Sequence, residues 1–450
     1  MKKVITYGTF DLLHRGHIRL LERAKALGDY LIVGVTSDNF DRMRGKINNQ
    51  QTLMERVEAV RALGLADEIL IEEYEGQKID DIRTYGVDIF TVGSDWEGTF
   101  DYLRDLCEVV YLPRTEGVSS SDIRTVRHKL RVGLVGWFRN ELTSLSKFIR
   151  EAAFVNGIEI PMVYAPSFDR SDASFAGISN TSSYDELLDA SDAVYIASHP
   201  TKHYEQIKAA LFRKKHVLCE APLALSAERA RELIDLSHRM GVVLMEHIKT
   251  AHTTAFSRML LLVKSGKIGQ VVAVDATCTS LKDIDAYTDE ELENNWNTIC
   301  EWGPVALLSV FRVLGNDYTS MQMLSRVSER NAQFDTFTKM NFVYPNAVAS
   351  VKIGKAAKSE GSLVISGTKG YIYVPAPWWK TDYFEVRYEN PADNQRYFYQ
   401  LDGEGIRNGL MAFLRAVETE DFSSERAERL SLSIASVMED FYNEQYIRLG

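Results

Sequence analysis

Two histidines, His14 and His17, lie three residues apart where an N-terminal strand gives way to a helix. The strand covers residues 4–7, and the helical pattern continues as IRLLERAKAL. A spacing of three residues puts both imidazoles on one face of the helix, beside backbone N–H groups that have no partner within the helix. Because a helix N-terminus attracts anions, the segment GTFDLLHRGH predicts a site for phosphate charge that develops during a reaction.

Several other polar residues among the first 130 could complete a phosphate site. Lys46, in the polar stretch RMRGKINN, could close over a triphosphate, although a lysine in such a loop is often only solvated. Arg56 and Arg114 carry forked donors that suit phosphate oxygens, although a helix arginine such as Arg56 also commonly pairs with carboxylates. Small and hydroxyl-bearing residues add donors or allow close backbone approach, namely Gly8, Thr9, Gly16, Ser119 and Ser120.

The elements that must position these residues alternate between strand and helix patterns, which predicts a parallel α/β sheet. Strand-like runs cover residues 4–7, 30–36, 68–71, 89–92 and 109–112. Helical patterns cover residues 18–27, 52–63, 78–85 and 121–129.

A second α/β pattern begins at LRVGLVGWF, residues 130–138, with almost no linker before it. From about residue 270 longer strands predict an antiparallel sheet, with helices near 303–314, 404–418 and 425–446. The prediction is therefore three domains, at 1–129, 130–250 and 251–450. The overall class is α/β: a Rossmann-like domain, followed by a Rossmann-type domain and an α+β open-sheet domain.

The composition of the chain excludes several classes of function. The chain has 450 residues, 45% hydrophobic and 26% charged, with a net charge of −11, so general affinity for nucleic acid or an anionic membrane is not expected. Its four cysteines form no CxxC pair, which suggests neither a zinc site nor a disulfide framework. The start MKKVITYGTF lacks an apolar signal core, and no apolar run approaches the ~20 residues that span a bilayer. We expect a cytoplasmic protein.

Three motifs in order make the first 130 residues resemble the glycerol-3-phosphate cytidylyltransferase family of HxGH nucleotidyltransferases. They are GTFDLLHRGH, VGSDWEGTFDYL at 92–103, and YLPRTEGVSSSDI at 111–123. The resemblance implies transfer of CMP from CTP, with Mg²⁺, to a small polyol phosphate, most simply glycerol 3-phosphate. It implies catalytic roles for His14, His17, Lys46 and Arg114. The product, CDP-glycerol, would be an activated polyol for a cell-surface polymer.

The same resemblance implies a set of nucleotide-binding positions. It adds Phe10, Asp11, Asp95, Trp96 and Thr115 to Gly8, Thr9, Gly16, Arg56, Ser119 and Ser120. Asp11 is expected to orient the site or to help hold the metal ion. Two departures from the family pattern, Arg15 within HxGH and Ser94 in SDWEG, bear on the identity of the acceptor.

From Arg131 onward the chain resembles the Gfo/Idh/MocA oxidoreductase family, through RVGLVG, KKHVLCEAPLALS, LLVKSGKIGQVV and ISGTKGYIYVPAPWW. The dinucleotide fingerprint needs three glycines at the first strand–helix turn, but here Gly136 is followed by Phe138 and Glu141. The family's catalytic lysine falls at Ala221, and its later histidine is placed at Phe311. These four replacements favour a domain without hydride chemistry, and NAD(P) binding is not favoured.

Three interpretations of this second region stay open. It could serve oligomerisation, scaffolding or ligand sensing. It could be a reductase with a relocated site, supplying the transferase from a keto-sugar phosphate with NAD(P)H, with His203, Lys249 and His252 as proton-transfer candidates. It could bind the acceptor or its glycan product. The resembled families and the aromatic strands (Tyr371, Tyr373, Trp378, Trp379, Tyr383, Phe384) suggest a homodimer or homotetramer.

Overall fold

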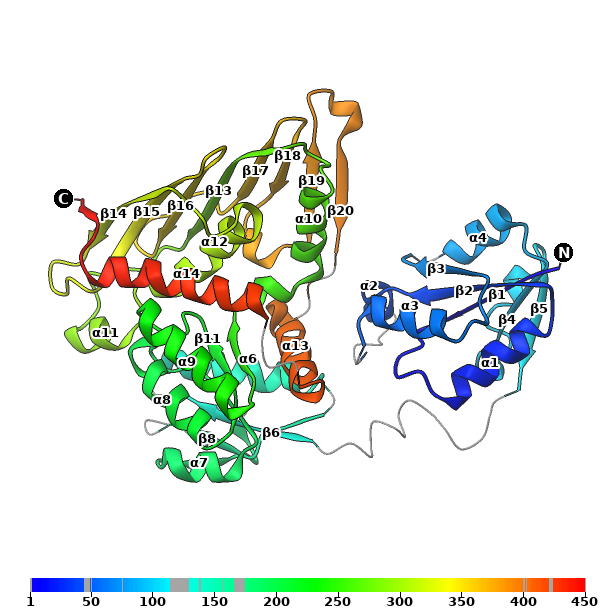
Figure 1. The fold of residues 1–450 in the computed structure, drawn as a ribbon, viewed down its shortest axis with the longest axis horizontal. Helices are drawn as coiled ribbons and strands as arrows, with labels where there is room; N and C mark the ends of the chain where they lie inside the picture. Colours follow the sequence, from blue (N-terminus) through cyan, green and yellow to red (C-terminus); the bar gives the residue numbers. More distant parts are fainter. Residues whose placement is uncertain are drawn as a thin grey trace. The chain divides into compact units, whose positions relative to one another are not determined.

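The computed structural model describes residues 2–43, 49, 51–74, 76–113, 129–136, 139–155, 157–165, 175–399, 401, 403–420 and 424–449. The chain divides into two compact units, Met1–His128 and Lys129–Gly450 (Figure 1). Each unit has its own hydrophobic core, so the two are described separately. No helix within the described ranges is long and apolar enough to cross a membrane.

The described part of the first unit contains a five-stranded parallel sheet in the order β3-β2-β1-β4-β5. Its strands are β1 (Lys3–Gly8), β2 (Tyr30–Thr36), β3 (Glu68–Glu72), β4 (Ile89–Gly93) and β5 (Glu108–Leu112). The helices that connect them are α1 (Arg15–Lys25), α2 (Asp38–Met43), α3 (Leu53–Ala62) and α4 (Gln77–Tyr85), with short 3-10 helices η1 (Ser94–Trp96) and η2 (Asp101–Leu103). The predicted alternation of strand and helix is confirmed.

Capping explains where two of these helices begin. The predicted helix at 18–27 starts earlier, at Arg15, because the side chain of His14 accepts the N–H of Gly16 and so caps it. Helix α3 begins after Thr52, whose hydroxyl accepts the N–H of Glu55 while the Glu55 carboxylate accepts the N–H of Thr52. This capping box satisfies two backbone donors and fixes the start of α3.

The second unit begins with a parallel sheet, in the order β12-β11-β10-β6-β8-β9 within its described residues, with β7 paired to β6. Its strands are β6 (Leu130–Val135), β7 (Ile158–Glu159), β8 (Met162–Tyr164), β9 (Ser179–Thr181), β10 (Ala193–Ile196), β11 (His216–Glu220) and β12 (Leu244–His247). The helices around it are α6 (Arg139–Ala152), α7 (Tyr184–Ala190), α8 (Pro200–Phe212) and α9 (Ala227–Met240).

A large mixed sheet follows, with the order β20-β19-β18-β17-β13-β16-β15-β14-β21 among the described residues. Its strands are β13 (Val271–Thr279), β14 (Ser320–Val327), β15 (Asp335–Val343), β16 (Val348–Gly354), β17 (Leu363–Gly367), β18 (Tyr371–Val374), β19 (Tyr383–Arg387), β20 (Gln395–Phe398) and β21 (Ile447–Arg448). The pairs β13–β16 and β14–β21 are parallel, and the other neighbours are antiparallel. The prediction of a wholly antiparallel sheet therefore needs correction at these two pairs.

Helix α12 (Thr298–Leu314) packs against this sheet, and α14 (Glu425–Tyr442) contacts both α12 and α9, so it joins the large sheet to the parallel one (Figure 1). The other described helices of this region are η4 (Lys249–His252), α10 (Thr254–Lys264), α11 (Asp289–Asn294), η5 (Trp378–Lys380), η6 (Pro391–Asp393), η7 (Gly403–Gly405) and α13 (Ile406–Glu418). Helix α13 returns to the core of the parallel sheet, where Ile406, Leu410 and Phe413 are buried. The two sheets of the second unit therefore share helices.

Candidate functional site

The loop between β1 and α1 has an unusual backbone conformation. Phe10 and Leu12 both have positive φ values, 52° and 48°, which bulky residues rarely adopt. This path folds the Phe10 ring back under Gly8, where a Cβ would lie 2.9 Å from the ring. Gly8 is therefore required for packing, and Phe10 (1% exposed) contributes to the core rather than to a nucleotide pocket.

His14 and His17 are brought together as the sequence predicts. Their rings stack with centroids 3.9 Å apart, and the edge of His17 also meets Phe10 at 5.6 Å. Nδ1 of His14 accepts the N–H of Gly16 at 3.0 Å. Partial burial lowers the pKa of His14 below its usual 6.5, so the ring is neutral at pH 7 and carries its proton on Nε2. The pair presents a neutral N–H donor at the N-terminus of α1.

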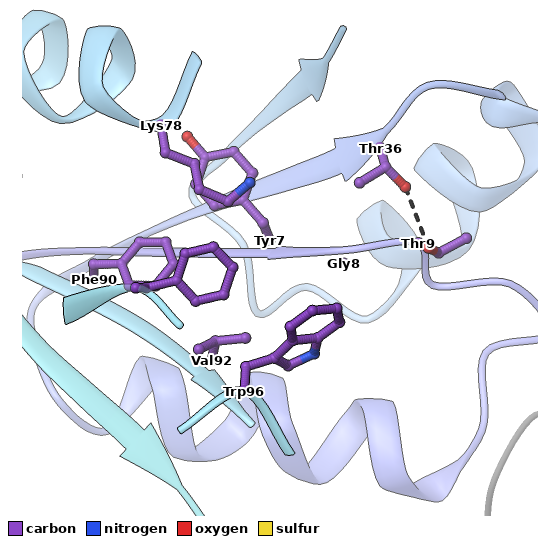
Figure 2. A pocket seen from close by; sticks show the side chains of 9 residues that line it. Tyr7, Gly8, Thr9, Thr36, Lys78, Phe90, Val92 and Trp96 are labelled. Atoms are coloured by element: carbon purple, nitrogen blue, oxygen red, sulfur yellow. Dashed lines mark hydrogen bonds between the residues drawn. The ribbon is translucent and has the colours of Figure 1, made fainter. Parts of the chain in front are cut away.

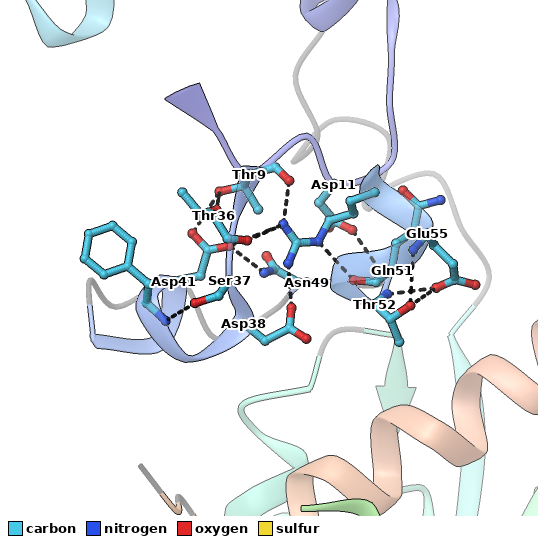
Figure 3. A network of polar contacts seen from close by, with 12 residues as sticks. Thr9, Asp11, Thr36, Ser37, Asp38, Asp41, Asn49, Gln51, Thr52 and Glu55 are labelled. Atoms are coloured by element: carbon cyan, nitrogen blue, oxygen red, sulfur yellow. Dashed lines mark hydrogen bonds and ion pairs between the residues drawn. The ribbon is translucent and has the colours of Figure 1, made fainter. Parts of the chain in front are cut away.

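Arg56 has a different role from the one that its residue type predicts. The side chain is fully buried, and its guanidinium donates to the carbonyl oxygens of Thr9 (2.7 Å) and Thr36 (2.8 Å). It also bonds to Asp38 Oδ1 at 2.5 Å and lies 3.7 Å from the buried carboxylate of Asp41 (Figure 3). With its donors used inside the protein, Arg56 supports the site loop and does not contact a phosphate.

Asp11 belongs to the same network. Its Oδ1 accepts the N–H of Gln51 at 2.9 Å, and the side chain is 2% exposed (Figure 3). Thr9 donates to Asp41, and Asn49 donates to the same carboxylate. Asp11 therefore orients the loop, and a carboxylate buried in this way does not fit the alternative role of metal ligand. Among the described residues, no group of three His, Cys, Asp or Glu side chains could hold a metal ion.

A pocket lies at the carboxyl edge of the first sheet, between β1, β4 and the start of α4 (Figure 2). Aromatic rings form its walls, and a single lysine is the cation in its described lining. The lining residues are Tyr7, Gly8, Thr9, Thr36, Lys78, Phe90, Val92, Trp96 and Phe100. The pocket thus joins two predicted site residues, Gly8 and Thr9, to the predicted Trp96.

Lys78 is the functional candidate that sequence reasoning missed. It is only 7% exposed, forms an ion pair with the buried carboxylate of Glu72, and its Nζ lies 4.7 Å from the ring centroid of Tyr7. The hydroxyl of Tyr7 donates to Asp81 at 2.7 Å, which holds the ring in place. A lysine in the first turn of a helix after a strand was the available signal, but its burial cannot be read from the sequence.

The other predicted residues of the first unit are not located. Lys46, Arg114, Thr115, Ser119 and Ser120 lie outside the described residues, and so does the predicted helix at 121–129. Asp95 lies in η1, but its side chain is outside the described part. The roles of these residues stay predictions.

The second unit gathers charged groups at the carboxyl edge of its parallel sheet. Glu220, at the end of β11, accepts a hydrogen bond from Tyr195 and lies 3.2 Å from Nζ of Lys249 and 3.6 Å from Nδ1 of His247. Burial alone would raise the pKa of Glu220, but Lys249 and His247 outweigh it and hold this pKa well below 4.5. Glu220 is therefore a carboxylate already satisfied by the protein.

Gly136 directly follows β6, the first strand of the fingerprint turn. Its N–H donates to the carbonyl of Tyr164 at 3.0 Å, so it continues the sheet. Phe138 lies outside the described residues, as does the side chain of Glu141 in α6. With Phe and Glu at the remaining fingerprint positions, we derive no reaction step through NAD(P).

Apolar residues occupy the two positions predicted to correspond to the family's catalytic lysine and histidine. Ala221, next to Glu220, is buried in the core and has no polar group, as expected. Phe311 is also a core residue: its ring packs against Tyr318 and Phe342, at centroid distances of 6.3 and 5.8 Å. Phe311 carries no proton-transfer group, and its alignment with the family's histidine stays a prediction.

One of the alternative proton-transfer candidates, His203, has a structural role. Both its ring nitrogens lie within 2.8 Å of backbone carbonyl oxygens, those of Pro222 and Ser198. Burial lowers the pKa of His252 to about 4, so this partly buried ring is neutral at pH 7. Lys249 alone among the three candidates lies beside Glu220.

Comparisons with known proteins agree with this geometry. The Cytidylyltransferase-like family matches residues 5–126. Glycerol-3-phosphate cytidylyltransferase of Bacillus subtilis (strain 168) is 52% identical over 124 residues, covering 28% of this chain and 95% of that enzyme. Its counterpart in Staphylococcus aureus (strain NCTC 8325 / PS 47) is 48% identical, covering 28% and 93%.

The chain belongs to the glycerol-3-phosphate cytidylyltransferase family. Because the match spans nearly the whole length of these relatives, the first unit of this chain is a nucleotidyltransferase. Both relatives match within the part of the chain that the first unit occupies, so they say nothing about the second unit.

The second unit has the Gfo/Idh/MocA fold. The oxidoreductase family with an NAD-binding Rossmann fold matches residues 130–248. A crystal structure of KijD10, a 3-ketoreductase from Actinomadura kijaniata in complex with NADP and TDP-benzene, has a TM-score of 0.62 at 19% identity and covers 72% of this chain and 100% of its own. Levoglucosan dehydrogenase in complex with NADH and levoglucosan has a TM-score of 0.61 at 17% identity, covering 70% and 97%. At these identities the likeness concerns the fold.

Proposed function

We propose that this chain transfers CMP from CTP to glycerol 3-phosphate, giving CDP-glycerol and pyrophosphate. The observation that carries the proposal is the stacked pair of His14 and His17 at the N-terminus of α1. His14 is held neutral with its proton on Nε2, which suits a hydrogen bond to phosphate oxygens as negative charge builds up on them.

The protein itself takes part in little covalent chemistry during this reaction. A phosphate oxygen of the acceptor attacks the α-phosphorus of CTP, the bond to the β-phosphate oxygen breaks, and pyrophosphate leaves with that electron pair. Positioning and charge neutralisation are then the main catalytic contributions. The histidine pair and the backbone donors at the start of α1 supply these contributions from the described residues, and Mg²⁺ enters with the triphosphate of CTP. Lys46 and Arg114 are proposed as further cations at the phosphates.

The pocket beside the histidines supports a small polyol as the acceptor. Its walls are largely aromatic, and the ammonium of Lys78, which is paired with the buried Glu72, lines the pocket (Figure 2). An ammonium donates to a hydroxyl oxygen. We therefore propose that Lys78 binds a glycerol hydroxyl while the phosphate faces His14.

For the second unit we propose a non-catalytic role in assembly or ligand binding. The apolar Ala221, where the resembled family has its catalytic lysine, supports it. One observation favours the competing hypothesis, a reductase that supplies the transferase. Lys249 lies beside Glu220 and could take the place of the missing lysine. Consumption of NADPH with a keto-polyol phosphate, followed at 340 nm, would support the reductase; its absence would support the proposal.

Assembly into a homodimer or homotetramer is also a proposal. Tyr371 and Tyr373 lie half-buried on β18, with the guanidinium of Arg387 stacked 4.6 Å from the ring of Tyr373. Trp378 and Phe384, by contrast, are buried in the unit's own core and do not serve an interface. Light scattering at micromolar concentration tests this, and a monomer would refute it. The cytoplasmic location stays a prediction.

The transferase proposal is tested by pyrophosphate release from the full-length chain with Mg²⁺. CTP is compared with ATP, GTP and UTP, and glycerol 3-phosphate with ethanolamine phosphate, choline phosphate and ribitol 5-phosphate. We expect turnover with CTP and glycerol 3-phosphate, with at least about tenfold lower kcat/KM for the other acceptors, which corresponds to about 1.4 kcal/mol. Preference for another acceptor would still agree with nucleotidyl transfer but would refute glycerol 3-phosphate as the acceptor.

A further inference from the structure

The loop that carries the histidine pair is braced by a residue from a distant segment, Gln51. The side-chain Oε1 of Gln51 accepts the N–H of Leu12 at 2.8 Å, and the backbone N–H of Gln51 donates to Asp11 Oδ1 at 2.9 Å. Its carbonyl oxygen accepts Nε of Arg56 at 3.3 Å. Three polar groups of Gln51 therefore contact the loop or Arg56, and Figure 3 shows the bond between Gln51 and Asp11.

The hydrogen bond to Gln51 holds a residue whose backbone is strained. Leu12 has a φ of 48°, and a leucine keeps such a conformation only where the surroundings enforce it. The bond from the Leu12 N–H to Gln51 does this directly. The backbone of Gln51 is held in place, because the next residue, Thr52, is the N-cap of α3 and its capping box fixes the start of that helix.

We propose that Gln51 is a positioning residue for nucleotidyl transfer. By holding Leu12 it sets the path of the chain into His14, two residues later, and hence the position of the His14 ring over His17. Without the Oε1 acceptor, Leu12 relaxes toward negative φ and His14 moves relative to His17. This inference rests on the proposed function for its kinetic test, but its geometry concerns the loop alone.

The kinetic test is a double-mutant cycle in the full-length chain. Gln51→Met keeps the length of the side chain and removes the acceptor, and Leu12→Gly removes the strain because glycine adopts positive φ freely. We expect Gln51→Met to lower kcat about 10–100-fold, the range for a misplacement near 1 Å, with KM for CTP within about threefold. In the Leu12→Gly background the same change should cost less than about threefold.

The matched control is Asp88→Ala. Asp88 Oδ2 accepts the N–H of Lys3 at 2.7 Å, also a side-chain oxygen on a backbone donor, but at the amino end of β1. This variant should keep its kcat. An equal loss for Gln51→Met in both backgrounds, or a loss that the control shares, would mean that Gln51 only stabilises the fold, and the proposal would be overturned.

A readout without turnover separates this inference from the proposed function. The imidazole resonances of His14 and His17 in ¹H–¹⁵N spectra should shift in Gln51→Met and stay unchanged in Asp88→Ala. If the wild-type chain releases no pyrophosphate with any acceptor, the proposed function fails, while the histidine resonances still decide the role of Gln51. Unchanged resonances in Gln51→Met would overturn it.

Discussion

Both units of this chain carry a parallel sheet whose carboxyl edge gathers ionisable side chains, and the two edges use those groups differently. In the first unit His14 holds its proton on Nε2 beside His17, and Lys78 lines a pocket. In the second unit Glu220 is bound by Tyr195 and Lys249, within the protein itself. The first edge places a histidine N–H donor at a helix N-terminus, whereas the charged groups of the second edge satisfy one another.

The difference shows how much of function lies in a few side chains on similar frameworks. Each edge is formed by parallel strands that end side by side. Loops and helix N-termini follow these strand ends. In the first unit the buried charges, Arg56 with Asp38 and Asp41, lie beneath the site loop and hold it in place. In the second unit the charges lie at the edge itself. From this comparison we expect substitutions in the two units to have different effects.

The largest effect is expected from the histidine pair. His14→Ala or His17→Ala should lower kcat by about 10²–10⁴-fold, because each removes a contact to the phosphates in the transition state. Steady-state pyrophosphate release measures this loss, and far-UV circular dichroism should show an unchanged fold. A loss of less than about tenfold for both variants would place the chemistry elsewhere.

The next effect concerns stability. Arg56→Met should destabilise the first unit by about 3–5 kcal/mol, because it leaves Asp41 buried without its cation. Arg131→Met in the second unit removes a partly exposed pair with Asp192 and should cost no more than about 1 kcal/mol. Urea denaturation of the full-length variants compares the two. Equal costs would contradict the view that Arg56 is a buried support for the site loop.

A smaller effect is expected at the pocket. Lys78→Met should lower kcat/KM for glycerol 3-phosphate about 10–100-fold, with KM for CTP within about threefold, since one charge-assisted contact to the acceptor is lost. Because this variant leaves Glu72 unpaired, the double variant with Glu72→Gln serves as the stability control. Restored thermal stability without restored kcat/KM is the expected result. Full recovery of activity in the double variant would show that Lys78 only neutralises Glu72.

The smallest effect is a pH dependence in the second unit. The folded pKa of Glu220 lies below 4.5, so folding releases its proton and its contribution to stability is present above pH 4.5. That contribution is lost as pH falls from 4.5 toward the folded value. The melting temperature of Glu220→Gln should therefore approach that of the wild-type chain between pH 5 and pH 3. A constant difference over this window would contradict the charge assignment.

The sequence predicted the two folds and part of the first site because the informative signals are local. His14, His17, Gly8 and Gly16 lie within one ten-residue segment, and a strand–helix junction fixes their geometry. Residue type alone was not enough for Arg56, since burial decides whether its donors reach a ligand. Lys78 was missed because its burial cannot be read from the sequence, and Gln51 because its partners Asp11 and Leu12 lie in a distant segment.

Errors in the second unit have a similar cause. Asn297 caps α12 by accepting the N–H of Cys300, so the helix begins five residues before its predicted start. Phe311 lies near the end of α12 and is buried in the core. The contact between Lys249 and Glu220 joins η4 to the end of β11, 29 positions earlier in the sequence (249 − 220).

The central claim is that nucleotidyl transfer belongs to the edge of the first unit and does not involve the charged edge of the second. It is tested most directly by CDP-glycerol formation from CTP and glycerol 3-phosphate, separated by chromatography, in the full-length chain carrying both Glu220→Gln and Lys249→Ala. Changing both partners leaves no unpaired charge. We predict a rate within about twofold of the wild-type chain, whereas a loss of tenfold or more in a folded protein would contradict the account.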